Sequence, residues 1–121
     1  MPEERKAEPP QDYLYRFDVW VSLNDRNGEK VDRSKFHALE WQLYNEFGGL
    51  TCTPIVGTPV YEGFWKDPET GKLMRDLNTV YTVFAPKTHA SYSYFEKNKQ
   101  KWQGDFNQKQ LLITVSQVEV L

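Results

Sequence analysis

The chain of 121 residues is poor in the residues that build disulfides and metal sites, since it has one cysteine and two histidines. The lone Cys52 excludes an intramolecular disulfide, and nothing in the sequence requires an oxidising compartment. The histidines show no His-x-x-x-His spacing and no Cys-x-x-Cys motif exists, so we expect neither a dedicated metal site nor a cofactor. No apolar run approaches the about 20 residues that span a bilayer, and segment 1–10 lacks the apolar region of a signal peptide. We therefore expect a cytoplasmic protein without membrane association.

The chain also lacks an excess of positive charge, because its formal net charge is −2. RNA-recognition domains need a basic, glycine- and aromatic-containing run on their third strand. The corresponding segment here, 77–84, has neither the glycine nor the basic residue. Trp20 and Tyr81 could still stack bases, but the acidic balance argues against it, and the lysines of segment 97–101 are typical of a solvated helix face. Nucleic-acid binding is thus the least favoured function.

What the sequence has is a clear order of strand and helix patterns after a charged, proline-containing segment, 1–12, which we expect to be a disordered tail. Alternating apolar residues predict a first strand, and Asp32 and Gly48-Gly49 bracket a first helix. Two prolines place the next strand at a sheet edge, while its partner after the turn 67–71 contains none and suits a central position. A shift in apolar phase near Ser116-Gln117 predicts a β-bulge or a bend in the last strand. The predicted elements are strands at 13–23, 51–65, 72–84 and 110–121, with helices at 32–47 and 88–106.

This order predicts an α+β fold, a ferredoxin-like βαββαβ domain over residues 13–121 with two helices on one face of an antiparallel sheet. The right-handed crossover rule then puts the second and fourth strands at the edges. Aromatic residues make up 15% of the chain, more than a minimal core requires. We therefore expect some of these rings to line a pocket or an interface.

The first predicted helix carries a carboxylate, Glu40, near the middle of an unusually wide apolar arc that includes Trp41. A carboxylate facing an apolar layer needs a partner or a raised pKa, and both are common at functional sites. The alternative is that Glu40 reaches the rim of the arc and pairs with Lys or Arg. His37 lies near Glu40 on the same helix and is a candidate for acid–base chemistry. Cys52 is better explained as a small buried thiol than as a nucleophile.

The predicted hairpin offers a second candidate site, because Trp65 and Arg75 lie on strands that pair across the turn. An arginine over an indole ring can bind an anion or a carbonyl group. The alternative is a hairpin stabilised by an aromatic residue and an Arg–Asp pair.

Four short motifs occur in a fixed order along the chain: Phe47-Gly48-Gly49-Leu50-Thr51, Gly63-Phe64-Trp65, Thr70-Gly71-Lys72 and Asp76-Leu77-Asn78. Together they resemble an uncharacterised family of small bacterial ferredoxin-like domains. The resemblance covers roughly residues 13–120 and implies a ferredoxin-like domain that can pair into a dimeric α/β barrel. It implies no known activity and supplies no catalytic residues.

Two functional hypotheses follow. The first is a non-catalytic binding or regulatory protein, a homodimer that recognises a small molecule or a partner protein through its surplus aromatic residues. The second is a cofactor-free enzyme of oxygenase or isomerase type in a dimeric-barrel pocket, with Glu40 or His37 as the proton carrier, Arg75 as the anion anchor and Trp65 as the wall. The candidate ligand-binding residues are Trp41, Trp65, Arg75, Trp20 and Tyr81.

Overall fold

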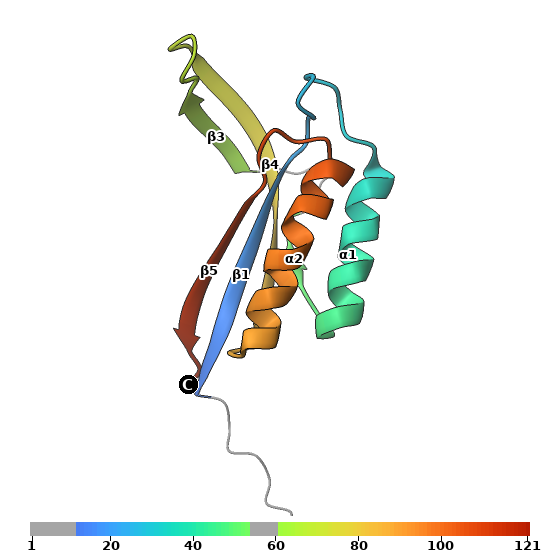
Figure 1. The fold of residues 1–121 in the computed structure, drawn as a ribbon, viewed down its shortest axis with the longest axis vertical. Helices are drawn as coiled ribbons and strands as arrows, with labels where there is room; N and C mark the ends of the chain where they lie inside the picture. The colour runs from blue at the N-terminus through green and yellow to red at the C-terminus, as the bar shows by residue number, and fades with distance from the viewer. Residues whose placement is uncertain (1–11, 54–60) are drawn as a thin grey trace, which may run out of the picture.

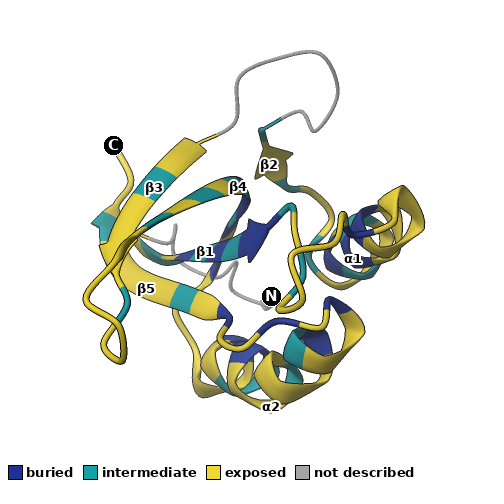
Figure 2. Cartoon of the chain, turned by 90° about the horizontal axis from the view of Figure 1, so that it is seen from above, coloured by how far each residue is buried: buried dark blue, intermediate teal, exposed yellow. Residues whose placement is uncertain are grey.

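The computed structural model describes residues 12–53 and 61–121. Its elements in chain order are β1 (Tyr13–Ser22), α1 (Arg33–Phe47), β2 (Thr51–Cys52), β3 (Tyr61–Lys66), β4 (Leu73–Pro86), α2 (His89–Asp105) and β5 (Leu112–Glu119). The strands form one antiparallel sheet in the order β2-β4-β1-β5, with β3 also paired to β4. Both helices cover the same face of this sheet, and the other face is open (Figures 1 and 2). The predicted ferredoxin-like α+β fold is therefore confirmed.

The predicted second strand is present as two strands along one edge of β4. Thr51 pairs with Thr82 in β2, and Tyr61 pairs with Asn78 in β3. The intervening residues 54–60, which include both prolines of the predicted edge strand, lie outside the described part of the chain. The edge positions of β2 and β3 and the central position of β4 are as predicted.

Local capping signals define both helices. The Asp32 carboxylate accepts a hydrogen bond from the Ser34 amide at the start of α1, and Gly48 ends the helix in the left-handed region at φ 81°. The Thr88 hydroxyl accepts from the Ser91 amide at the start of α2. These caps satisfy backbone groups that a helix end leaves unpaired, which is why the predicted boundaries agree closely with the structure.

The hydrophobic core lies between the helices and the covered face of the sheet. The rings of Phe17 and Phe95 stack with their centroids 4.0 Å apart, and Trp102 is also fully buried. Each such side chain contributes roughly 1.5–3 kcal/mol through burial, so this layer dominates the stability of the fold. The core further contains Val19, Val21, Leu39, Leu43, Tyr81, Val83, Phe106 and Leu111.

The predicted bulge in the last strand is wrong. The register between β1 and β5 runs without interruption from Tyr13↔Glu119 to Trp20↔Leu112. The apolar phase changes because Val118 faces the open side of the sheet, where it is paired with Leu14, and both side chains are half-buried. An apolar pair on the second face therefore produces the shift without an extra residue.

The residue that precedes β1 is hydrogen-bonded to the end of the chain that follows β5. The Asp12 carbonyl accepts a hydrogen bond of 2.7 Å from the Val120 amide, so this residue of the predicted tail is tied to the fold. The rest of that predicted tail, residues 1–11, lies outside the described residues. Among residues 12–53 and 61–121, neither helix is long and apolar enough to cross a membrane.

Candidate functional site

The two faces of the sheet present different side chains, and the register decides which residues share a face. Trp20 is paired with Val80, whereas Val19 is paired with Tyr81. Since side chains alternate along a strand, Trp20 and Val80 face the open side, and Val19 and Tyr81 face the helices. The sheet therefore separates two groups of candidate residues.

The open face contains a hollow of about 340 Å³ at the junction of β1, β2, β3 and β4. This volume lies at the lower end of the range for small-molecule sites, about 300–1,000 Å³. Aromatic and polar side chains share its surface, which suits a ligand with both a flat ring and charged groups. Its lining includes Arg16, Asp18, Trp20, Tyr61, Thr82 and Phe84.

A carboxylate stands at the polar side of this hollow. Asp18 accepts hydrogen bonds from Arg16 Nε at 3.0 Å and from the Thr82 hydroxyl at 2.5 Å. The Asp18 side chain is only 14% exposed, against 45% for Arg16, so the carboxylate is held and the guanidinium reaches solvent. The Arg16 guanidinium also lies 5.9 Å from the centre of the Phe84 ring, within the range of a cation–π contact.

The aromatic side of the hollow is formed by Trp20 and Tyr61, whose ring centroids are 5.6 Å apart. The indole nitrogen of Trp20 is buried and has no hydrogen-bond partner among the described residues. A buried N–H without an acceptor costs free energy, so the site has an unused donor beside its rings.

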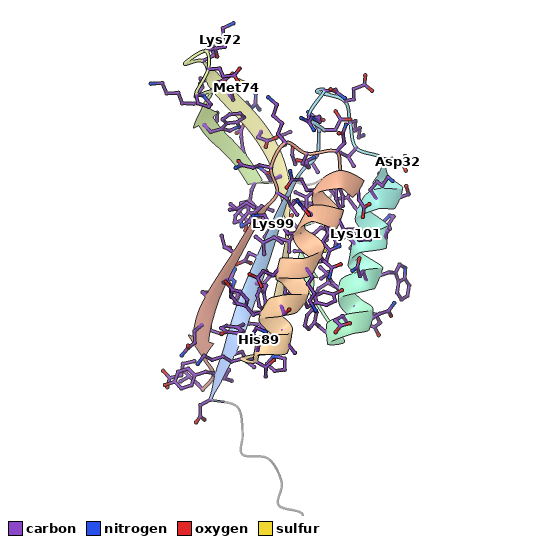
Figure 3. All side chains as sticks on the ribbon, viewed as in Figure 1. Asp32, Lys72, Met74, His89, Lys99 and Lys101 are labelled. Atoms are coloured by element: carbon purple, nitrogen blue, oxygen red, sulfur yellow. The ribbon has the colours of Figure 1, made fainter. Side chains whose placement is uncertain are left out.

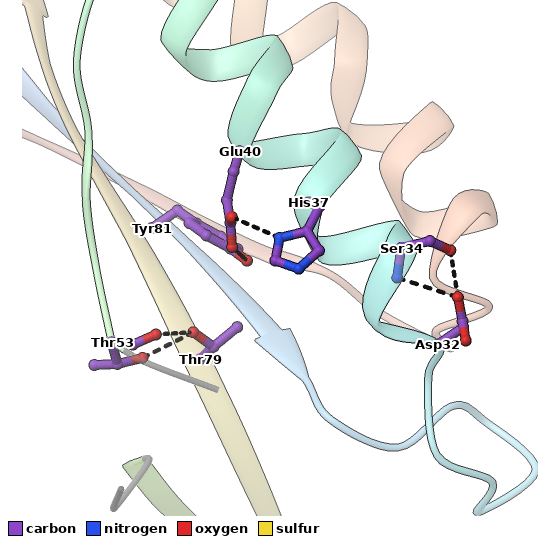
Figure 4. A network of polar contacts seen from close by, with 7 residues as sticks. All are labelled: Asp32, Ser34, His37, Glu40, Thr53, Thr79 and Tyr81. Atoms are coloured by element: carbon purple, nitrogen blue, oxygen red, sulfur yellow. Dashed lines mark hydrogen bonds and ion pairs between the residues drawn. The ribbon is translucent and has the colours of Figure 1, made fainter. Parts of the chain in front are cut away.

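On the helix side of the sheet, Glu40 is the centre of a second polar cluster (Figure 4). The Tyr81 hydroxyl donates to Glu40 Oε2 at 2.9 Å, and His37 Nδ1 lies 3.1 Å from Glu40 Oε1. Burial and the adjacent Glu40 carboxylate hold the pKa of Tyr81 well above its usual range. Burial and the same carboxylate also raise the pKa of the Cys52 thiol, whose residue is paired with Tyr81 in the sheet. A raised thiol pKa opposes reactivity, because the thiolate is the nucleophile.

The structure thus brings Glu40 and His37 together, as expected from their spacing. Glu40 has partners rather than an unpaired position against the core. The alternative in which Glu40 pairs with Lys or Arg is not found among the described residues, where its two oxygens contact Tyr81 and His37. The His37 side chain is 56% exposed on the helix surface and does not line the hollow. Cys52 is exposed on a two-residue edge strand, so the prediction of a buried thiol is wrong, and only partial covering of its sulfur contributes to the raised pKa.

Two contacts that the sequence left possible are absent among the described residues. Base stacking by Tyr81, part of the least favoured function, is excluded because Tyr81 is fully buried on the face opposite Trp20. Trp65 is paired with Met74 and Arg75 with Phe64, so Trp65 and Arg75 also lie on opposite faces of the hairpin.

Outside the hollow, the remaining candidates have other surroundings. Arg75 forms an ion pair with Glu62 across the hairpin. Trp41 is 63% exposed on α1, where its ring meets Tyr44 edge to face.

The sequence reasoning did not select Arg16, Asp18, Tyr61 or Thr82. A signal for the first two was present, because β1 alternates an apolar face with a mixed face that carries Arg16, Asp18 and Trp20. The contributions of Tyr61 and Thr82 depend on strand register, which no local pattern specifies here.

No protein-family model matches the chain. No curated protein matches it either. Among solved structures, it is similar to a phage SAM lyase in complex with S-methyl-5′-thioadenosine, with a TM-score of 0.55 over 88% of this chain and 90% of that chain. Only 10% of residues are identical, so the likeness concerns the fold. The shared architecture is that of two helices on one face of an antiparallel sheet.

Proposed function

We propose that this chain is a cofactor-free enzyme that binds an S-adenosylmethionine-type sulfonium compound in the hollow of the open face. The observation that carries the proposal is the composition of the hollow, where a guanidinium, a carboxylate and several aromatic rings meet on one surface. S-Adenosylmethionine has a matching set of groups: a flat base, a sulfonium cation and an amino-acid zwitterion.

Each ligand group has a counterpart in the hollow. The rings of Trp20 and Tyr61 offer surfaces for the flat base, and aromatic rings also attract a cation such as a sulfonium. The exposed Arg16 guanidinium can pair with the ligand carboxylate in a bidentate manner. Asp18 supplies the negative charge for the ammonium group or the sulfonium.

The fold neighbour supports this ligand class, because a domain of the same architecture is a SAM lyase that was solved with S-methyl-5′-thioadenosine. The likeness favours the enzyme hypothesis over the non-catalytic one. The position of the hollow changes the roles of two candidate residues. Glu40 and His37 belong to the helix side of the sheet, so in this proposal they support the fold rather than carry protons for the ligand.

Isothermal titration calorimetry with S-adenosylmethionine and with S-methyl-5′-thioadenosine tests binding, and chromatography of S-adenosylmethionine incubated with the full chain tests turnover. Trp20→Ala is expected to weaken the binding of both compounds by at least tenfold, about 1.4 kcal/mol, and Asp18→Asn that of S-adenosylmethionine alone, because S-methyl-5′-thioadenosine lacks the ammonium and sulfonium groups. Trp41→Ala is the matched control, because it removes an exposed indole that is not part of the hollow.

Three outcomes are distinct. In the proposed reaction the ligand's own carboxylate displaces the sulfur from the four-carbon chain, so S-adenosylmethionine gives S-methyl-5′-thioadenosine and homoserine lactone. Formation of these products, lost in Asp18→Asn but kept in Trp41→Ala, supports the enzyme. Binding without turnover supports the non-catalytic small-molecule protein instead. Failure of both compounds to bind, or equal binding by all variants, contradicts the placement of the ligand in the hollow.

A further inference from the structure

The hairpin of β3 and the first part of β4 extends beyond the rest of the sheet. Pairing between β1 and β4 begins at Ser22↔Asn78, and one further hydrogen bond joins the Leu23 amide to the Leu77 carbonyl. Among the described residues, segment 61–66 pairs only with β4, and segment 73–77 has no other strand partner beyond this bond. We refer to these two segments and their turn as the arm. Figure 1 shows the arm pointing away from the helices, and Figure 3 places Lys72 and Met74 near its end.

The arm exposes large apolar side chains on both of its faces. The register puts Tyr61 and Trp65 on the face continuous with the open side of the sheet, and Phe64, Leu73 and Leu77 on the other. A two-stranded ribbon is marginally stable in water unless something packs against it. The exposed fractions are 53% for Tyr61, 59% for Phe64, 47% for Trp65, 75% for Leu73 and 38% for Leu77.

We propose that the face of the arm formed by Phe64, Leu73 and Leu77 is an interface to a second copy of this chain. A large apolar side chain buries about 150–250 Å² when fully covered, so these three partly exposed residues offer on the order of 300 Å² of apolar surface on one arm. One arm alone falls short of a specific interface, which needs about 1,000 Å² or more in total. Two arms in a twofold contact bury the same patch on both copies, about 600 Å² of apolar surface, which matches the roughly 60% apolar share of an interface of that size.

Charge also favours a copy of the same chain. Residues 61–77 carry three positive side chains, at positions 66, 72 and 75, and four negative ones, at 62, 67, 69 and 76, which sum to −1. Glu62 and Arg75 already pair with each other. A nearly neutral, apolar surface gives no attraction to a strongly charged partner, whereas it is compatible with a copy of itself.

The arm is continuous with the candidate site, because Tyr61 belongs to both. A second copy on the Phe64 face lies on the opposite side of the arm from Tyr61 and leaves the hollow accessible. The interface itself does not depend on the identity of the ligand.

Sedimentation velocity of the full chain over a wide concentration range tests the proposal. The wild-type chain is expected to sediment as an oligomer, and Phe64→Glu and Leu73→Glu are expected to sediment as monomers, because each places a charge in the apolar contact. Trp41→Glu is the matched control and should remain oligomeric, since Trp41 is as exposed as Phe64 but lies on α1.

A monomeric wild-type chain at every concentration overturns the proposal, and so do arm variants that stay oligomeric. Circular dichroism distinguishes dissociation from unfolding in the variants. Should an arm variant unfold, amide hydrogen exchange of the wild-type chain gives a second measurement. Amides of β3 that exchange more slowly as concentration rises support the interface, and concentration-independent exchange contradicts it.

Discussion

The hydrogen bond between Tyr81 and Glu40 gives the sharpest prediction for stability. Tyr81 is fully buried in the sheet, and its hydroxyl donates at 2.9 Å to a carboxylate that also contacts His37. A hydrogen bond to a charged group contributes about 1.5–3 kcal/mol. The Glu40 side chain is 28% exposed, and water can replace part of the lost interaction. We therefore expect Tyr81→Phe to lower the free energy of unfolding by about 1–2 kcal/mol, roughly 5–10 °C in Tm.

A double-mutant cycle isolates this pair from other effects of the substitutions. Tyr81→Phe, Glu40→Gln and the double variant are unfolded in urea, and their free energies of unfolding are compared at neutral pH. We expect a coupling energy of about 1 kcal/mol, because the carboxylate is the specific partner of the hydroxyl. A coupling energy below about 0.3–0.5 kcal/mol, the usual limit of additivity, refutes the reasoning.

The same pair predicts the response to alkaline pH. Burial, and then Glu40, raise the pKa of Tyr81 in the folded chain, whereas an unfolded tyrosine ionises near pH 10. The contribution of Tyr81 to stability is therefore fully present below about pH 10 and is lost as the pH rises further, because the unfolded state releases a proton that the folded state keeps. Tyr81→Phe should make the decline of stability above about pH 10 less steep than in the wild-type chain.

Three further predictions concern local structure. Asp32→Ala removes the N-cap of α1 and should lower the free energy of unfolding by about 1 kcal/mol in a thermal melt. Gly48→Ala should cost about 1–2 kcal/mol because Gly48 has φ 81°, whereas Gly49→Ala, with no atom within 4 Å of the new methyl group, should change Tm little. Cys52 should react slowly with iodoacetamide at neutral pH because its pKa is raised, and Glu40→Gln should speed the reaction; an unchanged rate contradicts the effect of that carboxylate.

The sequence was sufficient for the elements whose signals are local. The side chains of Asp32 and Thr88 accept backbone hydrogen bonds within their own helix starts, and Gly48 adopts the left-handed conformation that ends α1. These interactions span a few residues, so a reading of the chain finds them. The topology then followed from general rules on crossovers and from the absence of proline in residues 73–85, which β4 requires as a central strand.

Register was the point at which sequence reasoning failed. A shift of one residue moves a side chain to the other face, and β4 carries apolar residues on both faces, with Val83 toward the helices and Val80 toward the open side. Its pattern therefore does not reveal which residues join Trp20. For the same reason, the hairpin sequence did not determine whether Trp65 and Arg75 lie on the same face, which their contact requires.

The candidate site illustrates what this limit means for function. Asp18 and Arg16 alone form a two-residue ion pair on one strand, which is an ordinary surface feature of little energetic weight. The pair becomes part of a site because Thr82 binds the carboxylate from β4 and Tyr61 meets Trp20 from β3. The three strands that supply these groups are brought together only by the sheet order. A function located in such a hollow is encoded in the pairing of distant segments, so its chemistry can be derived only after the register is known.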